Sequence, residues 1–270
     1  MMVRGLSQRR ACQLLGLCRS SLAYRAAPLR NVELTARLRE LAEAEPRLGS
    51  RMAWARLRDE FAPLNLKRVR RIWKTEGLNL RPRKTRRIRD AVKPDLVARH
   101  PGHVWCLDFC HDSYGSGLPF RCLAVIDEAS RECVALEAAR SIPALRVVEA
   151  LKAAFAEYGV PEHLRCDNGP EFVSWALKLF LESKGVAHVP IQPGSPWQNG
   201  FAESFVGTFR SECLDAEIFH NLADAQLKIS LWRHFYNEDR PHSSLGYLQP
   251  ALFRRKWEEV QAELGEPVVS

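Results

Sequence analysis

The sequence lacks the features that would place the protein in a membrane or outside the cell. No apolar run approaches the roughly 18 residues of a transmembrane helix, and the first residues lack the apolar stretch of a signal peptide. The eight cysteines form no Cys-x-x-Cys pair. The missing transmembrane and signal segments predict a cytoplasmic protein, and in that reducing compartment we expect the cysteines to behave as small buried hydrophobic residues.

A convincing zinc module is also missing. His103, Cys106, Cys110 and His111 crowd together in the sequence. Their spacing fits no common zinc module, and alternation along a strand would send the side chains to opposite faces. We therefore do not assign zinc to these four residues.

Acidic residues are scarce in the first hundred positions. Residues 1–100 carry 25 Lys and Arg against 9 Asp and Glu, whereas residues 101–270 carry 15 against 23. The net charge of +8 therefore combines a front part of +16 with a back part of −8. A basic segment attracts a polyanion by counterion release, so the front part predicts DNA or RNA binding, with a solvated basic surface as the alternative. The acidic part favours carboxylates held for another purpose, such as metal binding.

Residues 1–45 are predicted to form a basic segment of helix-turn-helix type. A short helix meets Gly16, and Ser20 or Ser21 would cap a second helix. A plain helical hairpin would look similar. In the helix-turn-helix interpretation, the side chains available to DNA include Arg19 and Arg25.

Residues 46–80 are predicted to form a second small helical module. Asn65 is a candidate cap for a helix that runs to Glu76 and is ended by Gly77. Three apolar side chains of that helix would face inward: Val69, Ile72 and Trp73. Its basic face would bind DNA through Lys67, Arg68 and Arg71.

A basic linker follows at residues 81–100. Seven of the thirteen residues at 81–93 are Lys or Arg. The linker is expected to run extended along a phosphate backbone, or else to be a solvated tether. The residues assigned to DNA here are Arg83, Lys84, Arg86 and Arg87.

The pattern of apolar and turn residues after Pro101 predicts an α/β domain over residues 101–262. Strands are expected at 103–111, 120–127, 132–138, 164–166 and 186–191. Helices are expected at 142–158, 171–184, 200–214, 222–238 and 251–263. Three hairpin-like strands followed by alternating helix and strand indicate a mixed five-stranded sheet flanked by helices. The aromatic side chains expected in its core are Trp105, Phe109, Trp175, Phe180 and Phe205.

Three carboxylates in this domain are the candidate catalytic residues. Asp108 lies in an apolar strand, Asp167 ends a strand, and Glu203 lies in the first turn of a helix. A buried strand has little reason to hold an unpaired Asp, because desolvating the charge costs several kcal/mol. Convergent carboxylates around Mg²⁺, with two ions as the expected number, would remove that cost and support phosphodiester chemistry. Taken singly, each residue could instead serve a salt bridge, a turn or a helix N-terminus.

The sequence motifs around these carboxylates resemble those of a known family. They read Trp105-Cys-Leu-Asp108-Phe, Arg165-Cys-Asp167-Asn-Gly-Pro-Glu-Phe172, Ser195-Pro-Trp-Gln-Asn-Gly-Phe-Ala-Glu203 and Tyr236-Asn-Glu-Asp-Arg-Pro-His-Ser-Ser-Leu-Gly-Tyr247. Together they are similar to the second-reading-frame transposases of the insertion-sequence-three family, within the Asp-Asp-Glu integrases and transposases. The resemblance covers nearly the whole chain.

The resemblance implies a ribonuclease H-like core with Asp108, Asp167 and Glu203 as catalytic metal ligands. It implies Mg²⁺- or Mn²⁺-dependent cleavage and strand transfer at the ends of an insertion sequence, on double-stranded DNA of both element and target. It also implies homo-oligomers on paired ends, a nucleoid-associated location in the cytoplasm, and an upstream-frame helix-turn-helix product as a fusion partner.

Several further residues are candidates around the site. Arg210 lies nearly two helical turns after Glu203, on the same face, where it could hold a DNA phosphate. Gln198 and Asn199 would contact DNA near the cleavage point or would simply build the loop. Asn168 and Glu171 would orient Asp167, or would serve as a turn residue and a helix N-terminal acid.

Two other functions remain open from the sequence. One is a catalytically silent DNA-binding regulator or inhibitor of transposition, which would use the basic front part alone. The other is a plain metal-dependent nuclease, which would cut DNA without joining it.

Overall fold

The computed structural model describes residues 7–20, 31–79, 96–192 and 196–264. The chain divides into two compact units, Met1–Pro46 and Arg47–Ser270. Five residues predicted to bind DNA lie outside the described ranges: Arg25, Arg83, Lys84, Arg86 and Arg87. No helix in the described part of the chain is both long enough and apolar enough to span a membrane.

The first unit contains helices α1 (Gln8–Leu14) and α3 (Val32–Ala44). The Ser7 side chain caps α1 by accepting from the Arg10 amide, and Gly16 follows the helix with a φ of +62°. The left-handed conformation suits glycine because it has no Cβ. Most of the predicted second helix after Ser20 lies outside the described residues. Cys18 is exposed, so the expectation that every cysteine is buried is wrong at this position.

The second unit begins with helices α4 (Ser50–Leu57) and α5 (Leu66–Thr75). The predicted cap of α5 is confirmed, because the Asn65 side chain accepts from the Lys67 amide at 2.8 Å. Gly77 has a φ of +70°, as expected of a residue that ends a helix. The predicted inward face is also confirmed: Val69, Ile72 and Trp73 are buried.

A mixed five-stranded sheet follows, as the sequence predicted. Its strands are β1 (Val104–Ser113), β2 (Pro119–Asp127), β3 (Cys133–Ala139), β4 (His163–Cys166) and β5 (Ala187–Pro190). Their spatial order is β3-β2-β1-β4-β5. The first three strands pair antiparallel, whereas β4 pairs parallel with both β1 and β5.

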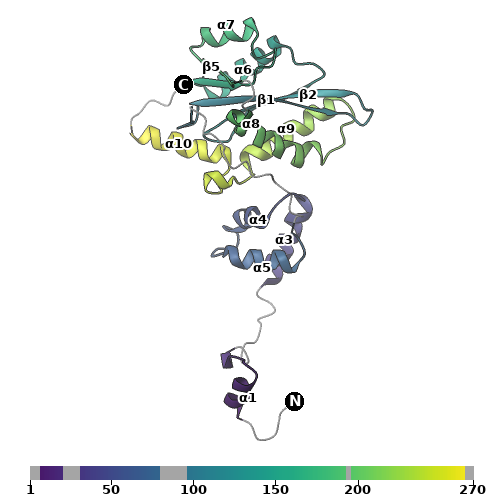
Figure 1. Cartoon of the computed structure of the whole chain (residues 1–270), viewed down its shortest axis with the longest axis vertical. Helices are drawn as coiled ribbons and strands as arrows, with labels where there is room; N and C mark the ends of the chain where they lie inside the picture. Colours follow the sequence, from purple (N-terminus) through teal and green to yellow (C-terminus); the bar gives the residue numbers. More distant parts are fainter. Residues whose placement is uncertain (1–6, 21–30, 80–95, 193–195, 265–270) are drawn as a thin grey trace. The chain divides into compact units, whose positions relative to one another are not determined.

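Helices cover both faces of the sheet (Figure 1). On one face, α6 (Ala144–Tyr158) and α7 (Trp175–Ser183) bury a core with Leu107 and Leu164. On the other, α8 (Gly200–Phe209) and α9 (Leu222–Glu238) pack over Cys106 and Ala124. Even-numbered residues of β1 face α8, and odd-numbered residues face α6, because successive strand side chains alternate. Asp108 therefore belongs to the α8 face.

Shorter elements complete the unit. A 3₁₀ turn (Pro196–Asn199) leads into α8, and a π-helical turn (Arg210–Leu214) continues it. A 3₁₀ turn at Ser243–Leu245 precedes the last helix, α10 (Pro250–Leu264).

One predicted helix begins later than expected. The helix predicted at 171–184 starts at Trp175, after Ser174 caps it by accepting from the Leu177 amide. The residues before it form a turn in which the Phe172 amide donates to the Gly169 carbonyl. Trp175 is 74% exposed, so its assignment to the core is wrong. Its position at the start of α7 faces away from the sheet.

Candidate active site

The register of two parallel strands brings the two aspartates to the same level. β1 pairs with β4 so that Val104 lies beside His163 and Cys106 beside Arg165. Continuing that register by two residues sets Asp108 beside Asp167, which directly follows β4. Neighbouring strands lie about 4.8 Å apart, and residues two apart share a face. The two aspartates therefore meet on the α8 side of the sheet.

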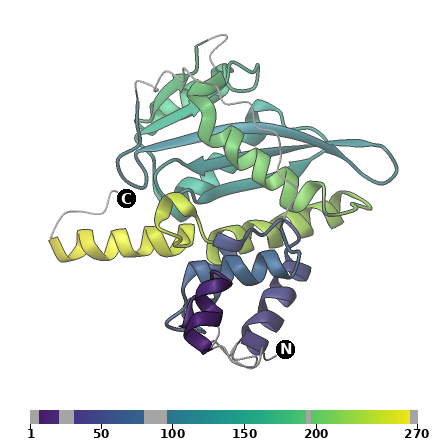
Figure 2. The same cartoon turned by 60° about the horizontal axis from the view of Figure 1, so that its bottom comes forward.

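Helix α8 brings the third carboxylate to the same face. It packs on β1 and β2 through Ala202 and Phe205, which are buried. Glu203 lies between these two residues in the first turn and is exposed. Figure 2 shows this helix lying across the strands. The apolar residues of α8 thus fix the helix, while Glu203 points into solvent.

One buried hydrogen bond joins the start of α8 to β1. Asn199, the residue before α8, is 4% exposed. Its Nδ2 donates to the carbonyl oxygen of Leu107 at 3.0 Å. Because Leu107 precedes Asp108, this bond couples the helix of Glu203 to the strand of Asp108. The buried position of Asn199 favours the loop-building interpretation over a DNA contact.

The Asp108 carboxyl is energetically unfavourable as an isolated charge. Its pKa is raised to about 6, mainly by burial and also by the charges of Asp167 and Glu203, against a lowering by the Phe109 amide. That amide donates to Asp108 Oδ1 at 2.8 Å. Desolvation and like charge together mark a site that lacks positive charge. A bound cation would supply it, so the donor set fits a hard divalent metal.

The three carboxylates are grouped loosely. Among the described residues, they do not form a group whose ligand atoms all lie within 4.8 Å of one another. Like charges repel, so a cation would be needed to draw them together. Rotation of the exposed Glu203 side chain is the simplest movement that would do so.

Asp167 is held by the backbone after it. Its Oδ1 accepts from the Gly169 amide at 2.9 Å. A Cβ on Gly169 would lie 3.0 Å from this same oxygen and 3.7 Å from Glu171 Oε2. A side chain at this position would therefore push on Asp167, which explains glycine there by space rather than by backbone conformation.

Asn168 and Glu171 have other partners. Asn168 Nδ2 donates to the Ile191 carbonyl at 2.8 Å, which links the ends of β4 and β5. Glu171 pairs with Arg121, whose hydrogen bond lowers the pKa of Glu171. Arg121 also lies over the Phe109 ring, 4.1 Å from its centroid. Both residues thus brace the loop around Asp167, and their predicted action on its carboxylate stays a prediction.

The remaining predicted DNA contacts near the site lie at its rim. Arg210 is exposed, and its Nη2 donates to the carbonyl of His111 on β1 at 2.9 Å. Gln198 Oε1 accepts from the Gln192 amide at 2.8 Å, across residues 193–195. This bond closes the loop before α8. DNA binding by either residue is untested.

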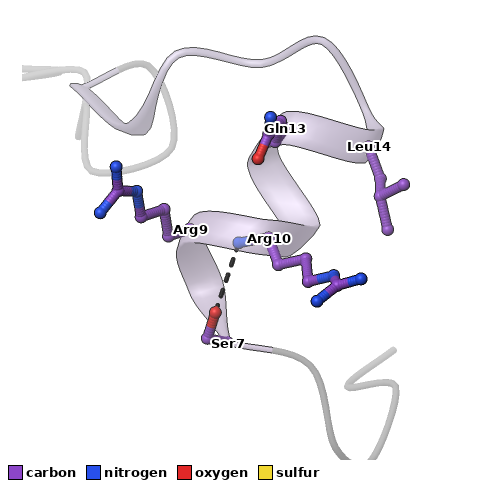
Figure 3. Close-up of a pocket in the computed structure, with 5 residues that line it drawn as sticks. All are labelled: Ser7, Arg9, Arg10, Gln13 and Leu14. Carbon is purple, nitrogen blue, oxygen red and sulfur yellow. Dashed lines mark hydrogen bonds between the residues drawn. The ribbon is translucent and has the colours of Figure 1, made fainter.

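Basic residues of the small helices are spread over exposed faces. Arg19, Lys67 and Arg71 are exposed, and Arg68 is half-buried. In α1 the Arg9 and Arg10 side chains extend to different sides beside a shallow hollow lined also by Gln13 and Leu14 (Figure 3). The predicted basic face of α5 therefore exists, whereas its ligand remains a prediction.

The sequence analysis assigned no role to two residues of the motif Tyr236–Tyr247. Asn237 is buried and exchanges two hydrogen bonds with the backbone of Cys133, at 2.9 and 3.0 Å. Arg240 makes two hydrogen bonds of 2.8 Å to Glu212, in the π-helical turn after α8. This motif therefore holds the π-helical turn that follows α8, the helix that carries Glu203. The sequence feature that could have indicated these roles is the density of polar residues after a long helix.

A buried ion pair was also missed. Arg165 on β4 pairs with Glu128, and both side chains are almost fully buried. The pKa of Glu128 is raised to about 7, because the effect of burial outweighs the lowering by Arg165 and Arg131. Arg165 also donates to the carbonyl of Leu96 at 2.6 Å, at the end of the predicted linker. A single Arg in an apolar strand was the available signal.

Comparison with known proteins agrees with this architecture. Two models described as "Integrase core domain" match residues 98–196 and 184–250, and one described as "HTH-like domain" matches residues 29–86. The fold is also found in the simian T-cell lymphotropic virus intasome, with a TM-score of 0.52, 16% identity, and coverage of 80% of this chain and 74% of that one. The fold thus defines an integrase-type, ribonuclease H-like core with helical modules before it.

Two curated relatives extend over most of the chain. One is an insertion element IS407 protein of Burkholderia multivorans, 41% identical over 93% of this chain and 91% of its own length. Another is an insertion element IS476 protein of Xanthomonas euvesicatoria, 38% identical over 97% of this chain and 76% of its own length. The chain belongs to the insertion-sequence-three family of integrase-core transposases.

Proposed function

We propose that this transposase cleaves DNA at the ends of its insertion sequence and transfers the strands into target DNA in a Mg²⁺- or Mn²⁺-dependent reaction. The observation that supports the proposal is the convergence of Asp108, Asp167 and Glu203 on one face of the sheet. Asp108 alone could be an isolated half-buried residue of the strand. The charges of both other carboxylates raise its pKa, which argues for a shared cation.

In this proposal the three carboxylates hold the metal, two ions being the expected number. When bound, such ions activate water or a 3′-hydroxyl and stabilise the leaving oxygen of a phosphodiester. Asp108 holds its carboxylate on a rigid central strand, and Asp167 on a loop tethered by Gly169. Glu203 completes the set from a helix docked by Asn199.

The reaction needs no covalent bond between protein and DNA. Hydrolysis at the element end frees a 3′-hydroxyl, which then attacks a target phosphodiester. Arg210, at the rim beside His111, is proposed to hold a phosphate of the terminal DNA. Gln198 is proposed to contact DNA from the loop before α8, and Asn168 and Glu171 to keep the Asp167 loop in place.

Double-stranded DNA is the proposed partner of the basic front part. Arg19, Lys67, Arg68 and Arg71 present positive charge on helical modules, and the basic linker at residues 81–100 adds more. Such contacts bind phosphates without reading sequence. We further propose homo-oligomers on paired ends, a cytoplasmic and nucleoid-associated location, and an upstream-frame product as a possible fusion partner.

Strand transfer with a labelled element end tests the proposal. Asp108→Asn, Asp167→Asn and Glu203→Gln should each reduce joined product by about a thousandfold, because each removes a metal-ligand charge. Asp215→Asn, which changes an exposed carboxylate outside the site, should leave it unaltered. Undiminished transfer by the three variants would refute the assignment.

The same assay separates the alternatives. A plain nuclease would yield cleaved ends without joined product. A silent regulator would bind end DNA with wild-type affinity and give neither product with Mg²⁺ or Mn²⁺. The three carboxylates favour the enzyme, because a regulator has no use for a half-buried Asp108 with two further carboxylates near it.

A further inference from the structure

A second group of potential metal ligands lies at the opposite ends of the two strands that carry the aspartates. His103 directly precedes β1, and Glu162 and His163 stand at the start of β4. One ligand atom from each residue lies within 4.8 Å of the other two. His103 is buried, His163 is half-buried and Glu162 is exposed, so the group opens to solvent on the carboxylate side.

The strand pairing fixes the positions of these residues. The His163 amide donates to the His103 carbonyl at 3.0 Å, and the Glu162 amide donates to the Gly102 carbonyl at 2.9 Å. The backbones of the three ligands are therefore part of the β1–β4 ladder. A site built on paired strands is held more rigidly than one built on loops.

The His163 ring is oriented as in a metal ligand. Its Nδ1 lies 3.3 Å from the His103 carbonyl oxygen. A carbonyl only accepts, so Nδ1 carries the proton and Nε2 keeps its lone pair. Metal-binding histidines commonly donate their other ring N–H to a backbone carbonyl in this way.

His100 adds a contact that a neutral ring does not explain. Its Nδ1 lies 3.0 Å from the Pro101 carbonyl, so this nitrogen is the donor. Its Nε2, then an acceptor, lies 3.2 Å from Glu162 Oε1, which also accepts. Either a proton or a bound cation must sit between these two atoms. The ring is held in place by stacking on Trp257 of α10, at 5.8 Å between centroids.

We propose that His103, Glu162 and His163, with His100 alongside, bind one Zn²⁺ or similar transition-metal ion, separate from the carboxylate site. Imidazoles combined with one carboxylate are a donor set that suits Zn²⁺ and not Mg²⁺. The Arg99 amide now donates to His103 Nδ1 at 3.2 Å. Binding through His103 Nε2 would move the ring proton to Nδ1 and break this hydrogen bond.

The ion would join the segment that enters β1 to the start of β4. His100 and His103 lie in the chain that leads from the basic linker into the core, and Glu162 and His163 belong to the core itself. Arg165 already ties this segment to β4 through the Leu96 carbonyl. An ion here would therefore fix the place where the linker leaves the core.

Co²⁺ titration of the full-length protein tests the site, because Co²⁺ absorbs much more strongly in four- or five-coordinate sites than in octahedral all-oxygen sites. We expect one equivalent with intense visible absorption, displaced by Zn²⁺. The band should persist in Asp167→Asn, which alters only the carboxylate site, and in His234→Ala, which removes an exposed histidine of α9. It should be lost in His163→Ala and strongly reduced in Glu162→Gln.

Thermal unfolding provides a second readout that does not depend on activity. Zn²⁺ should raise the Tm of the wild type and of His234→Ala, because a ligand of the native state stabilises it. It should leave the Tm of His163→Ala and Glu162→Gln unchanged. Absence of the Co²⁺ band, or equal stabilisation of all four proteins by Zn²⁺, would overturn the proposal and leave a proton as the bridge between His100 and Glu162.

Discussion

The side-chain nitrogen Nδ2 of Asn199 donates to the carbonyl oxygen of Leu107 at 3.0 Å, beneath the face where the carboxylates gather. This bond connects the residue before α8 to the residue before Asp108. The side-chain oxygen of Asn199, Oδ1, is buried and has no hydrogen-bond partner among the described residues. The Asn199 side chain thus helps to set the separation between Glu203 and Asp108, together with the buried apolar residues of α8.

Asn199→Ala should uncouple α8 from β1. Loss of the bond should lower the free energy of unfolding by about 1 kcal/mol. Because Glu203 would lose its fixed position, kcat for strand transfer should fall by more than tenfold, with a smaller change in KM for DNA. Denaturant unfolding and steady-state transfer measure the two effects. An unchanged kcat in a folded Asn199→Ala protein would contradict the positioning role.

Asp108→Asn should stabilise the metal-free protein at neutral pH. The pKa of Asp108 is raised to about 6, so the native state binds this proton more tightly than the unfolded chain does. Stability from this group is therefore present below its ordinary pKa and declines as pH rises towards 6. Allowing for partial exposure, the substitution should contribute about 1–2 kcal/mol at pH 7.5.

Urea unfolding in EDTA at about pH 7.5 and pH 4 measures this difference. The advantage of Asp108→Asn should shrink towards zero at the lower pH, where the wild-type carboxyl is largely protonated. A variant that is less stable than wild type at the higher pH would show that the Asp108 charge is already compensated. The raised pKa also predicts that Mg²⁺ affinity weakens below pH 6.

Gly169→Ala should damage the site with little effect on the fold. The new Cβ would lie 3.0 Å from Asp167 Oδ1, so the carboxylate must shift. We expect strand transfer to fall by about tenfold or more, with less than about 1 kcal/mol lost in stability. Gly207→Ala in α8 is the matched control, because no atom lies within 4 Å of its added Cβ and alanine favours a helix. Equal activity of the two variants would argue against a constrained Asp167.

Arg240→Ala should loosen the far end of the helix that carries Glu203. Its two bonds to Glu212 are charge-assisted and half-buried, so we expect a loss of about 1.5–3 kcal/mol. A double-mutant cycle with Glu212→Gln isolates the pair. A coupling energy near zero would mean that other contacts hold this turn.

Much of the fold could be predicted from the sequence, because local signals mark most elements. The Asn65 cap, the apolar spacing of α5 and Gly77 determine that helix almost to the residue. The start of α7 was placed too early, since Glu171 looked like a helix N-terminal acid. In the structure Glu171 pairs instead with Arg121, fifty positions earlier, and Ser174 provides the cap.

The site could be predicted only in part, because contacts between segments that are distant in the sequence have no local signal. Asp108, Asp167 and Glu203 were recognisable by residue type and by the sequence motifs around them. The burial of Asn199 depends on the packing of α8 against β1, and the meeting of His103 with His163 depends on parallel strand register, neither of which local sequence encodes. Arg165 gave a visible signal, a charge in an apolar strand, but its partner Glu128 lies across the sheet on another strand end.

The central claim is that Asp108, Asp167 and Glu203 share a divalent cation. A crystal of the protein soaked in Mn²⁺ tests it directly through the anomalous scattering of the metal. We predict a peak with carboxylate oxygens of Asp108 and Asp167 within about 2.5 Å, and Glu203 turned towards it. Clear Mn²⁺ peaks elsewhere on the molecule, with none between these two aspartates, would contradict the account.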